Sequence, residues 1–142
     1  MKVYFIGAGP GDPELLTIKA EKIIKKADIV IYAGSLISQD IIKLAKKAAR
    51  LYDSSGMSLE EVLRVIRRAK PAEKIIARIH SGDPSIYGAI QEQMDWCEKQ
   101  EIDYCVIPGV SSFQAAAASL KQELTLPGVS QTVILTRISG RT

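Results

Sequence analysis

Short apolar runs alternate with longer amphipathic stretches along most of this chain. The apolar runs are rich in β-branched residues and end at glycine, proline or polar residues, which is typical of buried β-strands. They are "KVYFIGAG", with a strand expected from Lys2 to Ile6, then "DIVIYAG", "EKIIARIH" and "DYCVI". A further short strand is expected from Arg50 to Tyr52.

The stretches between these runs carry apolar residues at helical spacing. Asp12 as N-cap and Pro13 in the first turn predict that a first helix starts here, with Leu15, Leu16, Ile23 and Ile24 on its apolar side. "SQDIIKLAKKA" predicts a second helix. Ser58 and Glu61 fit a capping box for a third, whose buried stripe is Leu59, Val62, Leu63 and Ile66. A fourth is expected from Ile86 to Gln100, with Ile86, Ile90, Met94 and Cys97 aligned, and "FQAAAASLK" predicts a fifth.

This alternation of strands and helices predicts an α/β fold, with a mostly parallel open sheet covered by helices on both faces. We expect an N-terminal α/β domain over residues 1–122 and a Pro/Gly-bearing linker over 123–130. Residues 131–142 contain the apolar run "SQTVILTRI" without a covering helix, which predicts the first strand of a second α/β domain that is otherwise absent.

Composition and charge exclude several classes of protein. Hydrophobic residues make up 46% of the chain and charged residues 25%, as in a soluble globular domain. The net charge of +3 comes from basic residues spread along helices, which argues against nucleic-acid binding. Cys97 and Cys105 lack metal-site spacing and suggest reduced thiols in a cytoplasmic protein. No apolar run approaches the ~20 residues that span a bilayer, and no signal peptide is expected.

Three glycine-containing loops follow predicted strands, and the first, "GAGPGD", matches no nucleotide-binding fingerprint. The dinucleotide motif needs a third glycine where Asp12 stands, and Pro10 removes a backbone donor from the turn. The second strand ends in "YAGS" without the acidic residue that holds a ribose, and no Gly-Lys-Ser/Thr follows the glycines. By itself this loop is equally well interpreted as a tight connection.

The loops "HSGDPS" and "PGVSS" allow both a functional and a structural interpretation. Gly82 permits close approach of a ligand, and Asp83 either accepts hydrogen bonds near a cation or caps the next helix. His80 is more simply interpreted as a strand-end histidine than as a catalytic base, because no partner residues are evident. Ser111 and Ser112 are equally compatible with N-caps.

Taken together, five motifs resemble one known family in their order and spacing. "GAGPGDPELLTIKA", "YAGSL", "HSGDPSIYGA", "PGVSSFQAAAASL" and "ELTLPGVSQTVILTR" are similar to the N-terminal part of the tetrapyrrole (corrin/porphyrin) methyltransferases, over the whole chain. The resemblance is nearest to members that methylate precorrin-4 or cobalt-precorrin-4 at C-11 in cobalamin (vitamin B12) biosynthesis. It implies a cytoplasmic enzyme that takes its methyl group from S-adenosylmethionine and commonly forms homodimers.

The resemblance also implies which residues contact the methyl donor and the tetrapyrrole. The expected cofactor contacts are Pro10, Gly82, Asp83, Ile86, Ser111 and Ser112. Candidate substrate contacts at the strand ends are Ser35, Asp53, Met57, Arg78 and His80, and His80 or Asp53 is a candidate for proton removal. Transfer from an activated donor requires alignment and exclusion of water rather than a nucleophilic side chain, so catalytic residues stay unassigned and no metal is expected.

Two alternatives remain open from the sequence. One is a sibling tetrapyrrole methyltransferase that acts at another ring carbon. The other is a truncated, non-catalytic domain that binds a tetrapyrrole or a partner protein.

Overall fold

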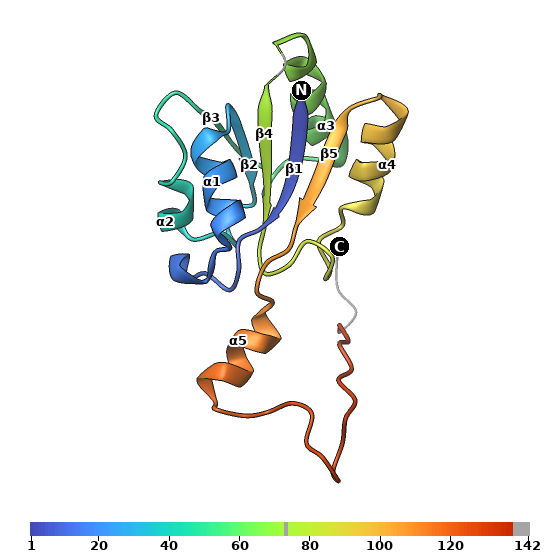
Figure 1. Ribbon diagram of the computed structural model, residues 1–142. Helices are drawn as coiled ribbons and strands as arrows, with labels where there is room; N and C mark the ends of the chain where they lie inside the picture. Colours follow the sequence, from blue (N-terminus) through green and yellow to red (C-terminus); the bar gives the residue numbers. More distant parts are fainter. Residues whose placement is uncertain (73, 138–142) are drawn as a thin grey trace. The chain divides into compact units, whose positions relative to one another are not determined.

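The computed structural model describes residues 1–72 and 74–137 and contains a five-stranded parallel sheet with strand order β3-β2-β4-β1-β5. The strands are β1 (Lys2–Gly7), β2 (Ile29–Tyr32), β3 (Arg50–Asp53), β4 (Ile75–His80) and β5 (Asp103–Ile107). β1 lies between β4 and β5 near the middle of the sheet (Figure 1). The predicted fold class is therefore confirmed. Residue 73, at the start of the predicted "EKIIARIH" strand, lies outside the described residues.

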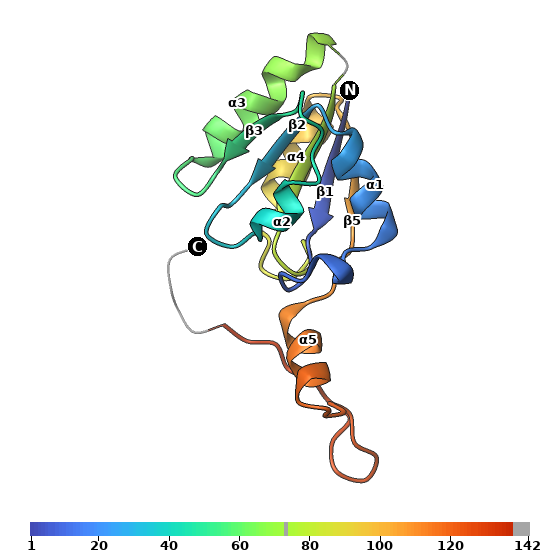
Figure 2. The ribbon, with the colours of Figure 1, turned by 90° about the vertical axis from the view of Figure 1, so that its left-hand side faces the viewer.

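Helices cover both faces of this sheet (Figure 2). On one face α1 (Ile18–Lys26) and α2 (Gln39–Ile42) bury Ala20, Ile24 and Ile41 against strand residues that include Ile6, Val30 and Ile79. On the other face α3 (Leu59–Ala69) and α4 (Gln91–Lys99) pack Val62, Ile66 and Cys97 against Val3, Phe5 and Ile76. Strands that are buried on both faces explain the continuous apolar runs of the sequence. Among the described residues, no helix is long and apolar enough to cross a membrane.

The capping box predicted for α3 is present. The Ser58 hydroxyl accepts a hydrogen bond from the Glu61 N–H, and the Glu61 carboxylate accepts one from the Ser58 N–H at 2.7 Å. These reciprocal bonds fix the start of α3 directly after the β3 loop.

The first predicted helix begins later than expected. Asp12 caps only a short 3-10 turn, η1 (Pro13–Leu15), because Leu16 and Thr17 adopt extended backbone conformations with ψ of 140° and 144°. The Thr17 side chain then accepts a hydrogen bond from the Ala20 N–H and caps α1. Thr17, and not Asp12, is therefore the N-cap of α1. The expectation of one continuous helix from Asp12 was wrong.

The fourth helix also starts later, at Gln91 rather than at Ile86. Tyr87 and Ala89 have positive φ of 55° and 48°, which an α-helix cannot contain. A Cβ on Gly88 would overlap the carbonyl oxygen of Pro84. The backbone at Gly88 therefore packs tightly against Pro84, in a turn that is not helical. Residues 83–90 are consequently a loop above the sheet edge.

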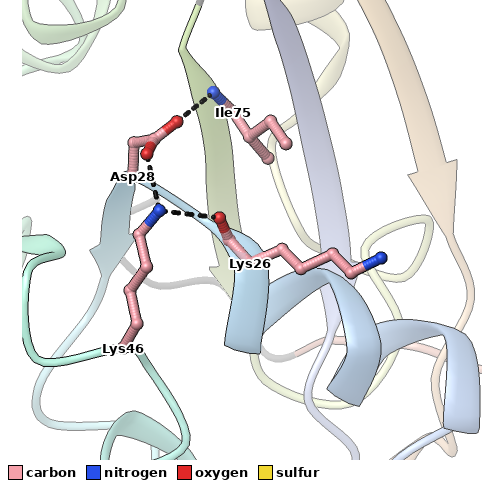
Figure 3. A network of polar contacts seen from close by, with 4 residues as sticks. All are labelled: Lys26, Asp28, Lys46 and Ile75. Carbon is pink, nitrogen blue, oxygen red and sulfur yellow. Dashed lines mark hydrogen bonds and ion pairs between the residues drawn. The ribbon is translucent and has the colours of Figure 1, made fainter.

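A polar network holds the amino-terminal edge of the sheet together (Figure 3). One Asp28 carboxylate oxygen accepts a hydrogen bond from the Ile75 N–H at 2.9 Å, and the other pairs with Lys46 at 2.7 Å. Lys46 also donates to the Lys26 carbonyl. Hydrogen bonds from Lys46 and from the Ile75 N–H lower the pKa of Asp28. Asp28 lies at the edge opposite the glycine loops and has a structural role.

The chain divides into two compact units, Met1–Ser112 and the segment from Phe113 on. The domain boundary expected at residue 122 lies within the second of these units and stays a prediction. η2 (Lys70–Ala72) belongs to the first unit, and α5 (Ser112–Ser119) starts at its end. Residues 131–137 have no assigned helix or strand, and the second domain expected from residues 131–142 stays a prediction. Residues 138–142 of that prediction lie outside the described residues.

Candidate functional site

The three glycine-containing loops follow β1, β4 and β5, which are adjacent in the sheet, so they meet at its carboxyl-terminal edge. The first two are joined by a pair of backbone hydrogen bonds: the Gly82 N–H donates to the Gly9 carbonyl at 2.8 Å, and the Gly9 N–H donates to the Gly82 carbonyl at 3.2 Å. Gly9 and Gly82 have φ of +71° and +59°, a region that favours glycine. Ligands bind at this edge in open α/β folds.

Glycine is required where the third loop joins the other two. A Cβ on Gly109 would overlap the Gly82 carbonyl oxygen, and a Cβ on Gly7 would lie 2.6 Å from both that oxygen and the Gly109 nitrogen. The backbones of all three loops therefore touch without intervening side chains. Gly7 and Gly109 were not among the predicted site residues, although their positions at the ends of strands in glycine-containing loops were visible in the sequence.

Asp83 ties the second loop to the third. One carboxylate oxygen accepts the Gly109 N–H at 2.9 Å, and the other accepts the Ser85 N–H at 2.8 Å. Partial burial alone would raise the pKa of Asp83, but these two N–H donors outweigh it, and the pKa lies below its ordinary value. Asp83 is thus an anion that closes a turn rather than the cap of α4, which begins only at Gln91.

The other predicted cofactor contacts surround this junction. Pro10 follows Gly9 and is exposed, and Ile86 is 40% exposed in the loop held by Asp83. A Cβ on Gly82 would lie 3.6 Å from the Ser111 Cα and 3.8 Å from the Ser112 nitrogen. Ser111 is buried and Ser112 exposed. The structure therefore gathers the predicted cofactor contacts in three adjoining loops.

Three of the predicted substrate contacts, Ser35, Asp53 and Met57, lie at the ends of β2 and β3 or in the loops that follow them, on the same edge. Asp53 accepts hydrogen bonds at 2.9 Å from the Gly34 N–H and from the Ser55 N–H, and these donors lower its pKa. Ser35 is exposed beside Gly34. Met57 is partly buried against the core beneath α3. A carboxylate stabilised in this way is a weak base, which argues against Asp53 as a proton acceptor.

Arg78 and His80 share one face of β4; His80 is buried and Arg78 is partly buried. Burial, and then the Arg78 charge, lower the pKa of His80 to about 3, so its ring is neutral at physiological pH. Its Nε2 is buried, with no hydrogen-bond partner in the described part of the chain. Burial lowers the pKa of Arg78 to about 10, which leaves it protonated. His80 is therefore not poised as a proton acceptor either.

Arg78 is held by two residues that the sequence did not single out. Its Nη1 donates to the Ser54 hydroxyl at 2.9 Å, and its Nε donates to the Gln93 side-chain oxygen at 3.4 Å. Within residues 1–72 and 74–137, no carboxylate forms an ion pair with Arg78. No sequence signal marks Ser54 or Gln93, because a polar residue on a helix or in a loop is usually solvated; here both are buried.

Comparison with known proteins identifies the family. The family model for Tetrapyrrole (Corrin/Porphyrin) Methylases matches residues 2–142. The chain belongs to this family. Among its curated members, a cobalt-precorrin-4 C(11)-methyltransferase from Methanocaldococcus jannaschii is 57% identical over 99% of the chain and 54% of the relative. One of the same name from Priestia megaterium is 49% identical over 100% of the chain and 55% of the relative.

Solved structures of the family agree with this fold. The X-ray structure of a cobalamin biosynthetic enzyme, cobalt precorrin-4 methyltransferase, superposes with a TM-score of 0.94 at 48% identity, over 99% of this chain and 59% of that one. A uroporphyrin-III C-methyltransferase from Thermus thermophilus, complexed with S-adenosylhomocysteine, gives a TM-score of 0.76 at 32% identity, over 93% of this chain and 53% of that one. This tetrapyrrole methylase chain spans about half the length of the curated relatives it matches.

Proposed function

We propose that this chain supplies the methyl-donor half of the active site of a tetrapyrrole C-methyltransferase. The reaction is transfer of a methyl group from S-adenosylmethionine to C-11 of precorrin-4 or cobalt-precorrin-4 in cobalamin biosynthesis. The observation that carries the proposal is the 57% identity to a cobalt-precorrin-4 C(11)-methyltransferase, which extends through all three loops at the carboxyl edge of the sheet.

The residues at this edge suit S-adenosylmethionine. The glycine junction brings the backbones of the three loops together without intervening side chains. Asp83 keeps a negative charge near neutral pH, which suits a cationic ligand. A relative with 32% identity was crystallised with S-adenosylhomocysteine, which supports the same ligand class here. We assign Pro10, Gly82, Asp83, Ile86, Ser111 and Ser112 to this ligand.

Bound S-adenosylmethionine supplies an already activated methyl group, so the chain's residues need only bind, orient and exclude water. The loops after β1, β4 and β5 are fixed to one another by hydrogen bonds before any ligand arrives, which lowers the entropic cost of binding. Ser35 and Asp53, after β2 and β3, are placed beside them and are proposed to contact the macrocycle.

The relatives are about twice as long as this chain, so we propose that residues 131–142 begin a second domain that completes the site. We propose that a strand of that second domain pairs with the apolar run within residues 131–137. By the same resemblance we propose a cytoplasmic homodimer. Size-exclusion chromatography with light scattering on a form extended to the relatives' length tests the dimer.

Methyl transfer is tested with the extended form, S-adenosylmethionine labelled with carbon-13 in its methyl group, and precorrin-4 with or without cobalt. We expect one labelled methyl group at C-11, located by NMR of the product. Label at another ring carbon would instead identify a sibling methyltransferase. Binding of S-adenosylhomocysteine and tetrapyrrole without any transfer would identify a binding protein and overturn the enzyme assignment.

A further inference from the structure

The loop between β4 and α4 holds an unfavourable backbone conformation. Tyr87 and Ala89 both have left-handed φ, at 55° and 48°, and Gly88 between them is closed against Pro84. A left-handed conformation is unfavourable for a non-glycine residue, and such strain persists only when the surroundings enforce it. The turn leaves Ile86 40% and Tyr87 58% exposed.

A buried side-chain relay reaches this turn from beneath. The Gln93 amide nitrogen donates to the Ala89 carbonyl at 3.1 Å, and the Gln93 amide oxygen accepts from Arg78 Nε. Arg78 also donates to the Ser54 hydroxyl, which donates to the Tyr32 carbonyl at the end of β2. Gln93 is only 4% exposed, so water cannot replace the lost partner if either bond is removed.

The relay connects the two halves of the sheet edge. Ser54 directly follows Asp53 on the β3 side, and Ala89 ends the loop that carries Gly82, Asp83 and Ile86 on the β4 side. Asp83 fixes the start of this loop through Ser85 and Gly109, and Gln93 fixes its end. Arg78 is partly buried and already donates to two neutral oxygens, one on each side of it, which favours a supporting role over a ligand contact.

We propose that Gln93, oriented by Arg78, is a positioning residue that holds the strained Tyr87–Ala89 turn and thereby presents Ile86 to the methyl donor. This inference rests on the proposed function for its ligand, and S-adenosylhomocysteine is the probe. Hydrogen exchange in the turn is measurable without any ligand. It also reassigns Arg78 from substrate contact to support of the cofactor loop.

The test compares substitutions at Gln93, Gln91 and Arg78 at low temperature, on variants whose fold is first checked by circular dichroism. Gln93→Leu removes both bonds of the amide. Gln93→Glu keeps an acceptor for Arg78 but has no N–H for the Ala89 carbonyl. Gln91→Leu is the matched control, since Gln91 lies in the same helix and its amide donates to the exposed Asp95. Hydrogen exchange of residues 86–90 and the Kd for S-adenosylhomocysteine are measured for each.

We expect Gln93→Leu and Gln93→Glu both to accelerate amide exchange in residues 86–90 and to weaken S-adenosylhomocysteine binding about tenfold, the size of one lost hydrogen bond. Gln91→Leu should change neither. Arg78→Met should weaken binding similarly, and adding it to Gln93→Leu should cost little more, since the two residues act in series.

Normal binding by Gln93→Glu would show that Gln93 serves only to satisfy Arg78, and would overturn the proposal. So would unchanged exchange in Gln93→Leu. An Arg78→Met variant that binds S-adenosylhomocysteine normally but has a raised KM for the tetrapyrrole would return Arg78 to the substrate site. If the unsubstituted protein, extended to the relatives' length, binds no S-adenosylhomocysteine, the proposed function fails while the exchange data still decide the positioning role.

Discussion

Replacing His80 should abolish most of the fall in stability that we expect between pH 7 and pH 5. In the folded chain burial, reinforced by the Arg78 charge, lowers the pKa of His80 to about 3 from an ordinary value of 6.5. The unfolded chain binds a proton below pH 6.5 and the folded chain does not. Stability is therefore fully present above this value and is lost as pH falls toward about 3.

The magnitude follows from linkage. Each pH unit below the unfolded pKa costs about 1.4 kcal/mol, so the free energy of unfolding should fall by about 2 kcal/mol between pH 7 and pH 5. Urea denaturation, followed by the fluorescence of Trp96, the chain's single tryptophan, measures this difference. Carboxylates with lowered pKa, such as Asp28 and Asp83, contribute their main loss at lower pH.

In His80→Leu the fall between pH 7 and pH 5 should nearly vanish, whatever the variant's absolute stability. Ile79→Val is the control, because it removes a methyl group from a buried, non-titrating neighbour and should lower stability equally at both pH values. A stability of the unsubstituted chain that is constant from pH 7 to pH 5 would refute the assignment of a buried neutral His80.

Three further substitutions test the fold and the loop junction. Asp28→Ala should lower the free energy of unfolding by about 1–2 kcal/mol in urea titration, because the Ile75 N–H loses its acceptor. Asp40→Ala removes an exposed ion pair with Lys43 and should change the free energy of unfolding by less than about 0.5 kcal/mol in the same titration. Gly109→Ala should destabilise the chain by about 1–3 kcal/mol and weaken S-adenosylhomocysteine binding, because the new Cβ would overlap backbone atoms. Gly56→Ala is the control, because a Cβ there meets open space; equal losses of stability in calorimetry would contradict the close packing of the three loops at Gly109. Ser58→Ala should cost about 1 kcal/mol by loss of the capping box, and an unchanged thermal midpoint would disprove that role.

The sheet was predictable because its inner strands are largely buried. Runs such as "KVYFIG" are apolar after their first residue, and the Ser58–Glu61 capping box is a local pattern that the structure reproduces. The start of α1 was missed because both Asp12 and Thr17 are good N-cap residues, and the spacing of apolar residues does not show which one caps the helix. The start of α4 at Gln91 was missed because that spacing does not show the left-handed turn at Tyr87.

The site was predictable only as a set of loops. Parallel strands bring "GAGPGD", "HSGDPS" and "PGVSS" to one edge, and the structure joins them. Asp83 was expected to cap a helix or contact a ligand, and its bond to Gly109 could not be foreseen because it joins residues 26 positions apart. Gln93 was missed because its role depends on its burial beneath the turn that it holds, which the sequence does not show.

The central claim is that the loops after β1, β4 and β5 form the methyl-donor site. NMR of the nitrogen-15-labelled protein titrated with S-adenosylhomocysteine tests it most directly, with the chain and its extended form run in parallel. We predict shifts in the amides of Gly9, Gly11, Gly82, Asp83, Ile86, Ser111 and Ser112, and none around the exposed groove of Glu60, Arg64 and Trp96 between α3 and α4. Saturable shifts confined to that groove, or to any surface away from the three loops, would contradict the account.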